Sequence, residues 1–112
     1  MGLVEEALVL FRGHYKFWLI KAQLQESTNL IEEARATYEE ALVTEGVKSE
    51  RQVWLSFADF EARHLALTKA RTILQKARIR MPADDLIWLA SARLEVRSEN
   101  SKIALNLVSQ AL

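Results

Sequence analysis

Apolar residues recur along this chain at spacings of three and four, which is the period of an α-helix. In "WLSFADFE", residues 54–61, the side chains of Trp54, Phe57 and Ala58 fall on one helical face. The alternating pattern of a β-strand is missing, and only three glycines and one proline interrupt the 112 residues. The pattern therefore predicts an all-α fold.

Three tryptophans mark an internal repeat. They lie 36 and 34 residues apart, and each is followed sixteen residues later by an alanine and twenty residues later by an aromatic or aliphatic residue. A fixed offset from the tryptophan indicates a shared place in a packed core. The predicted repeat core consists of Trp18, Trp54, Trp88, Ala34, Ala70, Ala104, Tyr38, Leu74 and Val108.

Each repeat is expected to be a pair of helices, with the tryptophan on the first helix. We predict the end of a preceding repeat in residues 1–16 and repeats in 17–46, 47–83 and 84–112, the last one truncated. Neither end carries a polar capping repeat, so we expect a slice of a longer array that self-associates in isolation. Asn29 with Glu32 forms a candidate capping box, and Asp84 is a candidate N-cap.

One residue conflicts with this pattern. Glu61 lies seven residues after the second tryptophan and so points toward the core. A buried carboxylate needs a partner, and Arg71 at the start of the next helix is the candidate for an inter-helix ion pair. The alternative is a partly solvated Glu61 at the rim. For the equivalent Glu95, we expect Arg93 or Arg97 as the donor.

Composition adds little chemistry. Fifteen basic and fifteen acidic residues cancel, and cysteine is absent, which excludes disulfides and thiolate metal sites. The two histidines, His14 and His64, are fifty residues apart, and no phosphate loop or nucleophile motif occurs. No apolar run reaches the roughly 18 residues that span a bilayer. We therefore expect no enzyme activity, no cofactor, no metal and no membrane contact.

Charge is unevenly distributed. Residues 69–80 hold five cations and no acid, and four of them form a candidate basic surface for a partner or RNA: Lys69, Lys76, Arg78 and Arg80. The simpler alternative is attraction between this segment and the acidic repeat before it, through weak exposed pairs. Direct RNA contact is not expected, because no exposed aromatic residue is interleaved with the cations.

The motif W-x-x-x-A-x-[FL]-E followed by A-R-x-x-[YL]-x-x-A resembles the HAT (half-a-tetratricopeptide) repeat, and it is complete in the middle repeat. The segments "KFWLIK" and "LTKARTILQKARIRMP" resemble HAT arrays of pre-mRNA splicing. The resemblance implies a right-handed α-solenoid of TPR-like helix-turn-helix repeats. It also implies a non-catalytic nuclear scaffold that bridges components of the tri-snRNP. Its implied partners are other spliceosomal snRNP proteins and adjoining HAT repeats.

Two other functions fit the same repeats. One is an RNA-binding helical module, and the other is a HAT scaffold of mRNA 3′-end processing or ribosome biogenesis. HAT relatives tend to have glycine in the turn between the two helices, where this chain has Asn29, Leu65 and Glu99. Leucine is unsuited to a left-handed conformation, so a rearranged turn is expected at Leu65.

Overall fold

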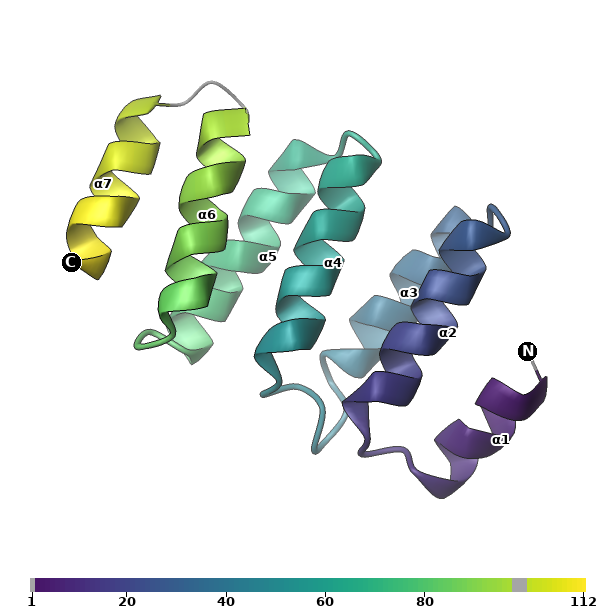
Figure 1. Ribbon diagram of the computed structural model, residues 1–112. Coiled ribbons are helices and arrows are strands. Elements are labelled where there is room, and N and C mark those ends of the chain that lie inside the picture. Colours follow the sequence, from purple (N-terminus) through teal and green to yellow (C-terminus); the bar gives the residue numbers. More distant parts are fainter. Residues whose placement is uncertain (1, 98–100) are drawn as a thin grey trace. The chain divides into compact units, whose positions relative to one another are not determined.

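The computed structural model describes residues 2–97 and 101–112, apart from the side chains of 101–104. These residues form α-helices and no strand, as the periodicity predicted (Figure 1). The helices are α1 (Gly2–Leu10), α2 (Tyr15–Ser27), α3 (Ile31–Ala41), α4 (Arg51–Arg63), α5 (Leu67–Arg80), α6 (Asp85–Arg97) and α7 (Ser101–Ala111). The all-α helical-repeat class is confirmed, whereas the handedness stays a prediction.

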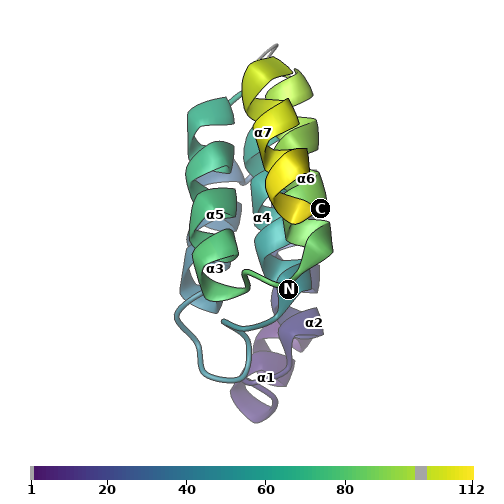
Figure 2. The same ribbon diagram turned by 90° about the vertical axis from the view of Figure 1, so that its left-hand side faces the viewer.

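The chain divides into two compact units, Met1–Val53 and Trp54–Leu112. In the first unit, α1 packs on α2, and α2 packs along α3. In the second unit, α6 contacts both α5 and α7. The side view of Figure 2 places α5 in a different layer from α4 and α6, and Figure 1 shows it behind the space between them. This arrangement sets α5 beneath the two tryptophan-bearing helices of the unit.

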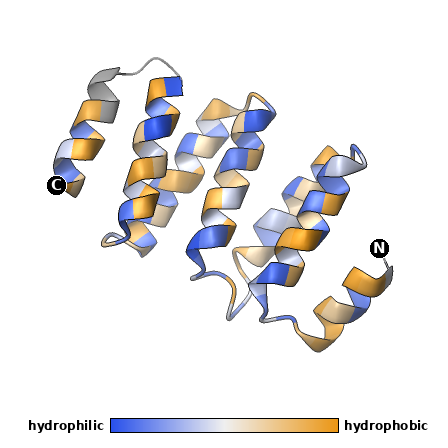
Figure 3. Ribbon diagram, in the orientation of Figure 1, coloured by the Kyte–Doolittle hydropathy of each residue, from blue (hydrophilic) through white to orange (hydrophobic). Residues whose placement is uncertain are grey.

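Each unit has an apolar core built from the repeat positions. Trp18 and Tyr38 are each 2% exposed in the first unit, and Trp54 is 5% exposed in the second. Alanines between these large side chains let the helices approach closely, in keeping with the small residues expected at helix crossings. In Figure 3, most helices carry both hydrophobic and hydrophilic residues, whereas α1 is largely hydrophobic.

The turns after α2 and α4 have the same geometry. Asn29 and Leu65 adopt φ values of 64° and 61°, both in the left-handed region. After α4, the Leu65 amide donates to the Ala62 carbonyl at 3.1 Å, and the Ala66 amide donates to the Glu61 carbonyl at 2.8 Å. These two bonds define a Schellman motif. The prediction of a rearranged turn at Leu65 is therefore wrong. The hydrogen bonds that end α4 hold the leucine in the left-handed conformation despite its strain.

Helix starts agree only in part with the sequence signals. The Asp84 carboxylate accepts a 3.1 Å hydrogen bond from the Leu86 amide, so the predicted N-cap of α6 is confirmed. The predicted capping box of Asn29 with Glu32 is wrong, because Asn29 lies in the turn after α2 and the N-cap of α3 is Leu30, which has no capping side chain. None of the helices in the described part of the chain has the length and apolar character to cross a bilayer.

Candidate functional site

The position seven residues after each tryptophan is polar and buried. Gln25, Glu61 and Glu95 are 7%, 1% and 2% exposed. Within the described residues, every buried side-chain nitrogen and oxygen has a hydrogen-bond partner, so these three side chains are satisfied. Glu61 thus lies in the core and not at a solvated rim, which removes the simpler of the two interpretations.

Arg71 of α5 binds Glu95 of α6 in a bidentate pair. Its Nε donates to Glu95 Oε1 at 2.6 Å and its Nη2 donates to Oε2 at 3.1 Å. Hydrogen bonding to Glu95 raises the pKa of Arg71, so the guanidinium stays charged. The expectation that Arg93 or Arg97 would serve Glu95 is wrong, because the cation comes from the preceding helix. The pairing of Arg71 with Glu61 stays a prediction.

This pair joins one predicted repeat to the next. Arg71 belongs to the second helix of the predicted repeat at 47–83, and Glu95 belongs to the first helix of the predicted repeat at 84–112. The carboxylate is almost fully buried, while the Arg71 side chain is 31% exposed. A bidentate contact has strict geometry, so it fixes how α6 is placed along α5.

The first unit has an uncharged counterpart. The Thr37 hydroxyl on α3 donates to the Gln25 Oε1 atom on α2 at 2.5 Å, and both side chains are buried. This bond lies within one helix pair, whereas the Arg71–Glu95 pair links successive helix pairs. The same repeat position therefore makes two different contacts, through the amide of Gln25 and the carboxylate of Glu95.

Two of the tryptophans make the same pair of contacts. Each donates its indole N–H to a backbone carbonyl, and each has the guanidinium of a different arginine over its ring. The Trp18 indole N–H donates to the Arg12 carbonyl at 2.8 Å, and the Arg12 guanidinium lies 5.2 Å from the ring centroid. The Trp88 indole donates to the Pro82 carbonyl at 2.8 Å, and Arg78 lies 5.3 Å from that ring. Burial lowers the pKa of Arg78 below its ordinary value, and the nearby Glu95 charge offsets this only in part. These arginines cover the edge of the core by cation–π contact.

The other predicted core positions divide by location. Ala34, Tyr38, Ala70 and Leu74 are buried. Trp88 was expected in the core but is half-buried, and Val108 was also expected there but is 43% exposed. Val108 lines an open groove between α6 and α7, which leaves part of its side chain uncovered. Ala104 lies outside the residues whose side chains are described.

The four cations of the basic segment differ in exposure. Arg78 is half-buried and lies over the Trp88 ring, so its place on the predicted basic surface stays a prediction. Lys69, Lys76 and Arg80 are exposed. Their spacings of seven and four place them on one stripe of α5. The candidate surface is therefore a row of three cations on a single helix.

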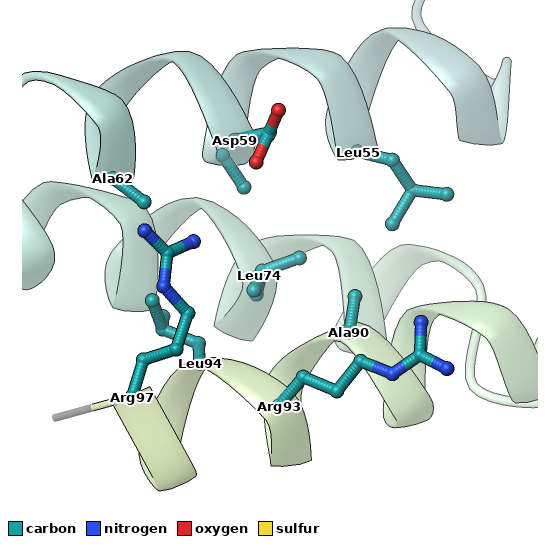
Figure 4. Close-up of a pocket in the computed structure, with 9 residues that line it drawn as sticks. Leu55, Asp59, Ala62, Leu74, Ala90, Arg93, Leu94 and Arg97 are labelled. Atoms are coloured by element: carbon teal, nitrogen blue, oxygen red, sulfur yellow. The ribbon is translucent and has the colours of Figure 1, made fainter. Parts of the chain in front are cut away.

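A groove lies between α4 and α6, with a cavity volume of about 260 Å³ (Figure 4). Its apolar surface comes from both helices and from Leu74 of α5 beneath them. Asp59 stands on the α4 side, and Arg93 and Arg97 stand on the α6 side. In Figure 4 the Arg97 guanidinium lies on the Ala62 side of Leu74, and the Arg93 guanidinium lies on the Ala90 side.

Comparison with known proteins identifies two relatives. "Pre-mRNA-splicing factor prp1" of Schizosaccharomyces pombe is 27% identical over 97 residues, which cover 87% of this chain and 10% of the relative. "Pre-mRNA-splicing factor 6" of Saccharomyces cerevisiae is 32% identical over 111 residues, covering 98% of this chain and 12% of the relative. The chain is homologous to a segment of both proteins. It spans about a tenth of their length. No protein-family model matches it.

The sequence alone did not predict the groove between α4 and α6. Asp59 and Arg93 both lie five residues after a repeat tryptophan, and Arg97 follows Arg93 by one helical turn. These spacings could have indicated a shared surface on the tryptophan-bearing helices. The described residues contain no cluster of three histidine, aspartate or glutamate side chains able to hold a metal ion. The arrangement can bind another chain through apolar and cationic contacts.

Proposed function

We propose that this chain is a segment of a non-catalytic scaffold in pre-mRNA splicing. The observation that carries the proposal is the similarity to a splicing factor over 98% of the chain. The helical pairs support it, because such repeats offer extended side-chain surfaces and bury their polar groups in structural contacts. The Arg71–Glu95 pair supports it further, since a scaffold needs successive repeats held in fixed register.

In its finer form, the proposal is a right-handed array of HAT repeats at 17–46, 47–83 and 84–112, preceded by the end of another repeat. The array acts in the nucleus and bridges proteins of the tri-snRNP. Its partners are other spliceosomal snRNP proteins and adjoining repeats of a longer chain. The sequence motif and the names of the two relatives support this form.

A groove between α6 and α7 supports contact with an adjoining repeat. It has a cavity volume of about 790 Å³, and its lining includes Leu89, Val96, Leu105 and Val108, which are 41% to 68% exposed. Apolar side chains at this level of exposure form the kind of patch that marks an interaction surface. An amphipathic helix of a further repeat would cover it, and a second copy of the chain would cover it in the isolated fragment.

The exposed stripe of Lys69, Lys76 and Arg80 favours a second function, RNA binding, because three aligned cations can follow a phosphate backbone. Two observations weigh against it as the main function. The whole chain has no net charge, and α5 carries no aromatic residue for base stacking.

The deciding experiment is capture from nuclear extract with the chain as bait, with and without ribonuclease, followed by mass spectrometry. Capture of tri-snRNP proteins that survives ribonuclease supports the proposed scaffold. A matched bait with Lys76→Glu and Arg80→Glu should behave identically. Capture that depends on RNA and is lost in this variant would favour the RNA-binding function. Exclusive capture of 3′-end or ribosome-assembly factors would move the scaffold to another complex.

A further inference from the structure

The groove between α4 and α6 has an apolar base. Ala58 and Ala62 face it from α4 and Ala90 faces it from α6, so short side chains leave space above Leu74. Leu94 completes the base and, like Leu74, is itself largely buried. The surface is therefore a fixed part of the packed unit, and an apolar group placed there would be removed from water without unfolding the helices.

Positive charge prevails over negative charge around this apolar base. Asp59 forms an ion pair with Arg63 one turn later on α4, which offsets its negative charge. Arg93 and Arg97 are exposed, and no carboxylate among the described residues forms an ion pair with either one. Within the described part of the chain, the groove therefore presents two cations beside an apolar base, and a ligand that complements it carries negative charge.

The size of the groove limits the occupant. Its volume of about 260 Å³ is below the roughly 300 Å³ at which sites for small molecules begin. An α-helix is about 10 Å across, which is too wide to enter a space of this size. One large aliphatic side chain fits within this volume, and an extended backbone can place further side chains on both sides of it along the groove.

We propose that this groove binds an extended acidic peptide segment of a partner protein, anchored by one aliphatic side chain on Leu74. Carboxylates before and after the anchor pair with Arg93 and Arg97, whose guanidinium groups lie on opposite sides of Leu74 in Figure 4. The inference rests on the proposed role in protein binding and adds the chemistry of one partner segment. It does not depend on which complex the partner belongs to.

RNA fits the same cations but not the base between them. Leucine, alanine, aspartate and arginine line the groove, and none offers an aromatic face on which a nucleobase can stack. An unstacked base would also leave its polar edges against alanine and leucine without hydrogen bonds. The groove therefore favours an acidic peptide over a nucleic acid.

The test uses fluorescence anisotropy with a fluorescein-labelled peptide in which one leucine has two glutamates on each side. The protein variant is Arg93→Gln with Arg97→Gln, which removes both cations. The matched control is Lys76→Gln with Arg80→Gln, which removes the same charge from the exposed face of α5. The groove variant should weaken binding about five- to thirtyfold, from two exposed charge pairs, and the control should change it less than about twofold.

A second pair of measurements separates the anchor from the charge. Replacing the peptide leucine by serine should weaken binding at least about tenfold, because the apolar contact on Leu74 is lost. Ala90→Leu should have a similar effect, since it fills the groove from α6. Circular dichroism of each protein variant checks that the helices remain, and the serine peptide requires no change in the protein.

The outcomes also separate this inference from the proposed splicing function. Equal loss of binding in the groove variant and the α5 control would overturn it, because that result indicates attraction to net charge alone. Binding of an oligouridine probe that depends on Arg93 and Arg97, with no peptide binding, would overturn it in favour of RNA. Peptide binding that meets these expectations supports the groove even if extract capture finds no splicing protein. Failure of the peptide alongside such capture overturns only the groove.

Discussion

Replacing Arg71 by methionine tests the contact between successive repeats. Methionine keeps much of the packing volume of the side chain but removes both hydrogen bonds to Glu95, at 2.6 and 3.1 Å. The Glu95 side chain is only 3% exposed, so its carboxylate would lose its cation while remaining in the core. Breaking a buried ion pair in this way typically costs about 3–5 kcal/mol.

The exposure of Arg71 reduces this cost. Its side chain is 31% exposed, so water can replace part of the lost guanidinium contact. We expect Arg71→Met to lower the free energy of unfolding by about 2–4 kcal/mol. For a chain of this size, that loss corresponds to a fall in the melting temperature of roughly 10–20 °C.

The reciprocal change should be milder. Glu95→Gln removes the buried charge and keeps one oxygen that can accept a hydrogen bond from Arg71. The Arg71 guanidinium, which is partly exposed, can also turn toward solvent. We expect a loss of about 1 kcal/mol. Arg63→Met provides a control that breaks the exposed pair with Asp59, and it should cost under about 1 kcal/mol. Combining Arg71→Met with Glu95→Gln should cost less than the sum of the two single changes.

Urea unfolding followed by circular dichroism and tryptophan fluorescence measures these differences. Coincidence of the two signals checks that unfolding is two-state, a condition that repeat proteins do not always meet. The reasoning would be refuted by Arg71→Met costing no more than Glu95→Gln or Arg63→Met. That result would mean that Glu95 does not need Arg71 as a buried partner.

Four further predictions concern single features. Leu65→Gly should stabilise the chain by about 0.5–1 kcal/mol in urea unfolding, because the leucine has φ 61° and is 88% exposed. Trp54→Ala should cost about 3–5 kcal/mol, and the half-buried Trp88→Ala should cost less; equal melting temperatures would contradict this order. Thr37→Val should cost about 1–2 kcal/mol by removing the donor to Gln25, a loss that thermal melts can detect. The isolated chain should self-associate through the apolar groove between α6 and α7, and a monomer in concentrated light-scattering samples would count against it.

The sequence predicted the helices and most of the core because both follow from local periodicity. Trp18, Trp54, Tyr38 and Leu74 occupy repeat offsets and are buried in the structure. The same reasoning was wrong at Val108, since an offset gives the direction of a side chain on its own helix but not what covers it. A residue is buried only when another element packs over it.

Ion-pair partners were harder to predict than positions. Spacing showed that Glu95 points into the core, but it led us to expect a donor from the same helix. The structure supplies Arg71 from α5, twenty-four residues earlier. At Leu65, local propensity argued against the left-handed turn, whereas the hydrogen bonds that end α4 outweigh the strain of the leucine.

The sequence by itself determined the all-α class, the repeated motif, the burial of Trp18 and Trp54 and the resemblance to splicing scaffolds, because these depend on residue types at fixed spacings. Only the tertiary structure decided that Arg71 binds Glu95 and that Arg78 packs on Trp88. It alone brought Arg93, Arg97 and Leu74 to one groove. Such contacts join helices that are distant in sequence, and they depend on how far each helix is rotated and shifted against its neighbour.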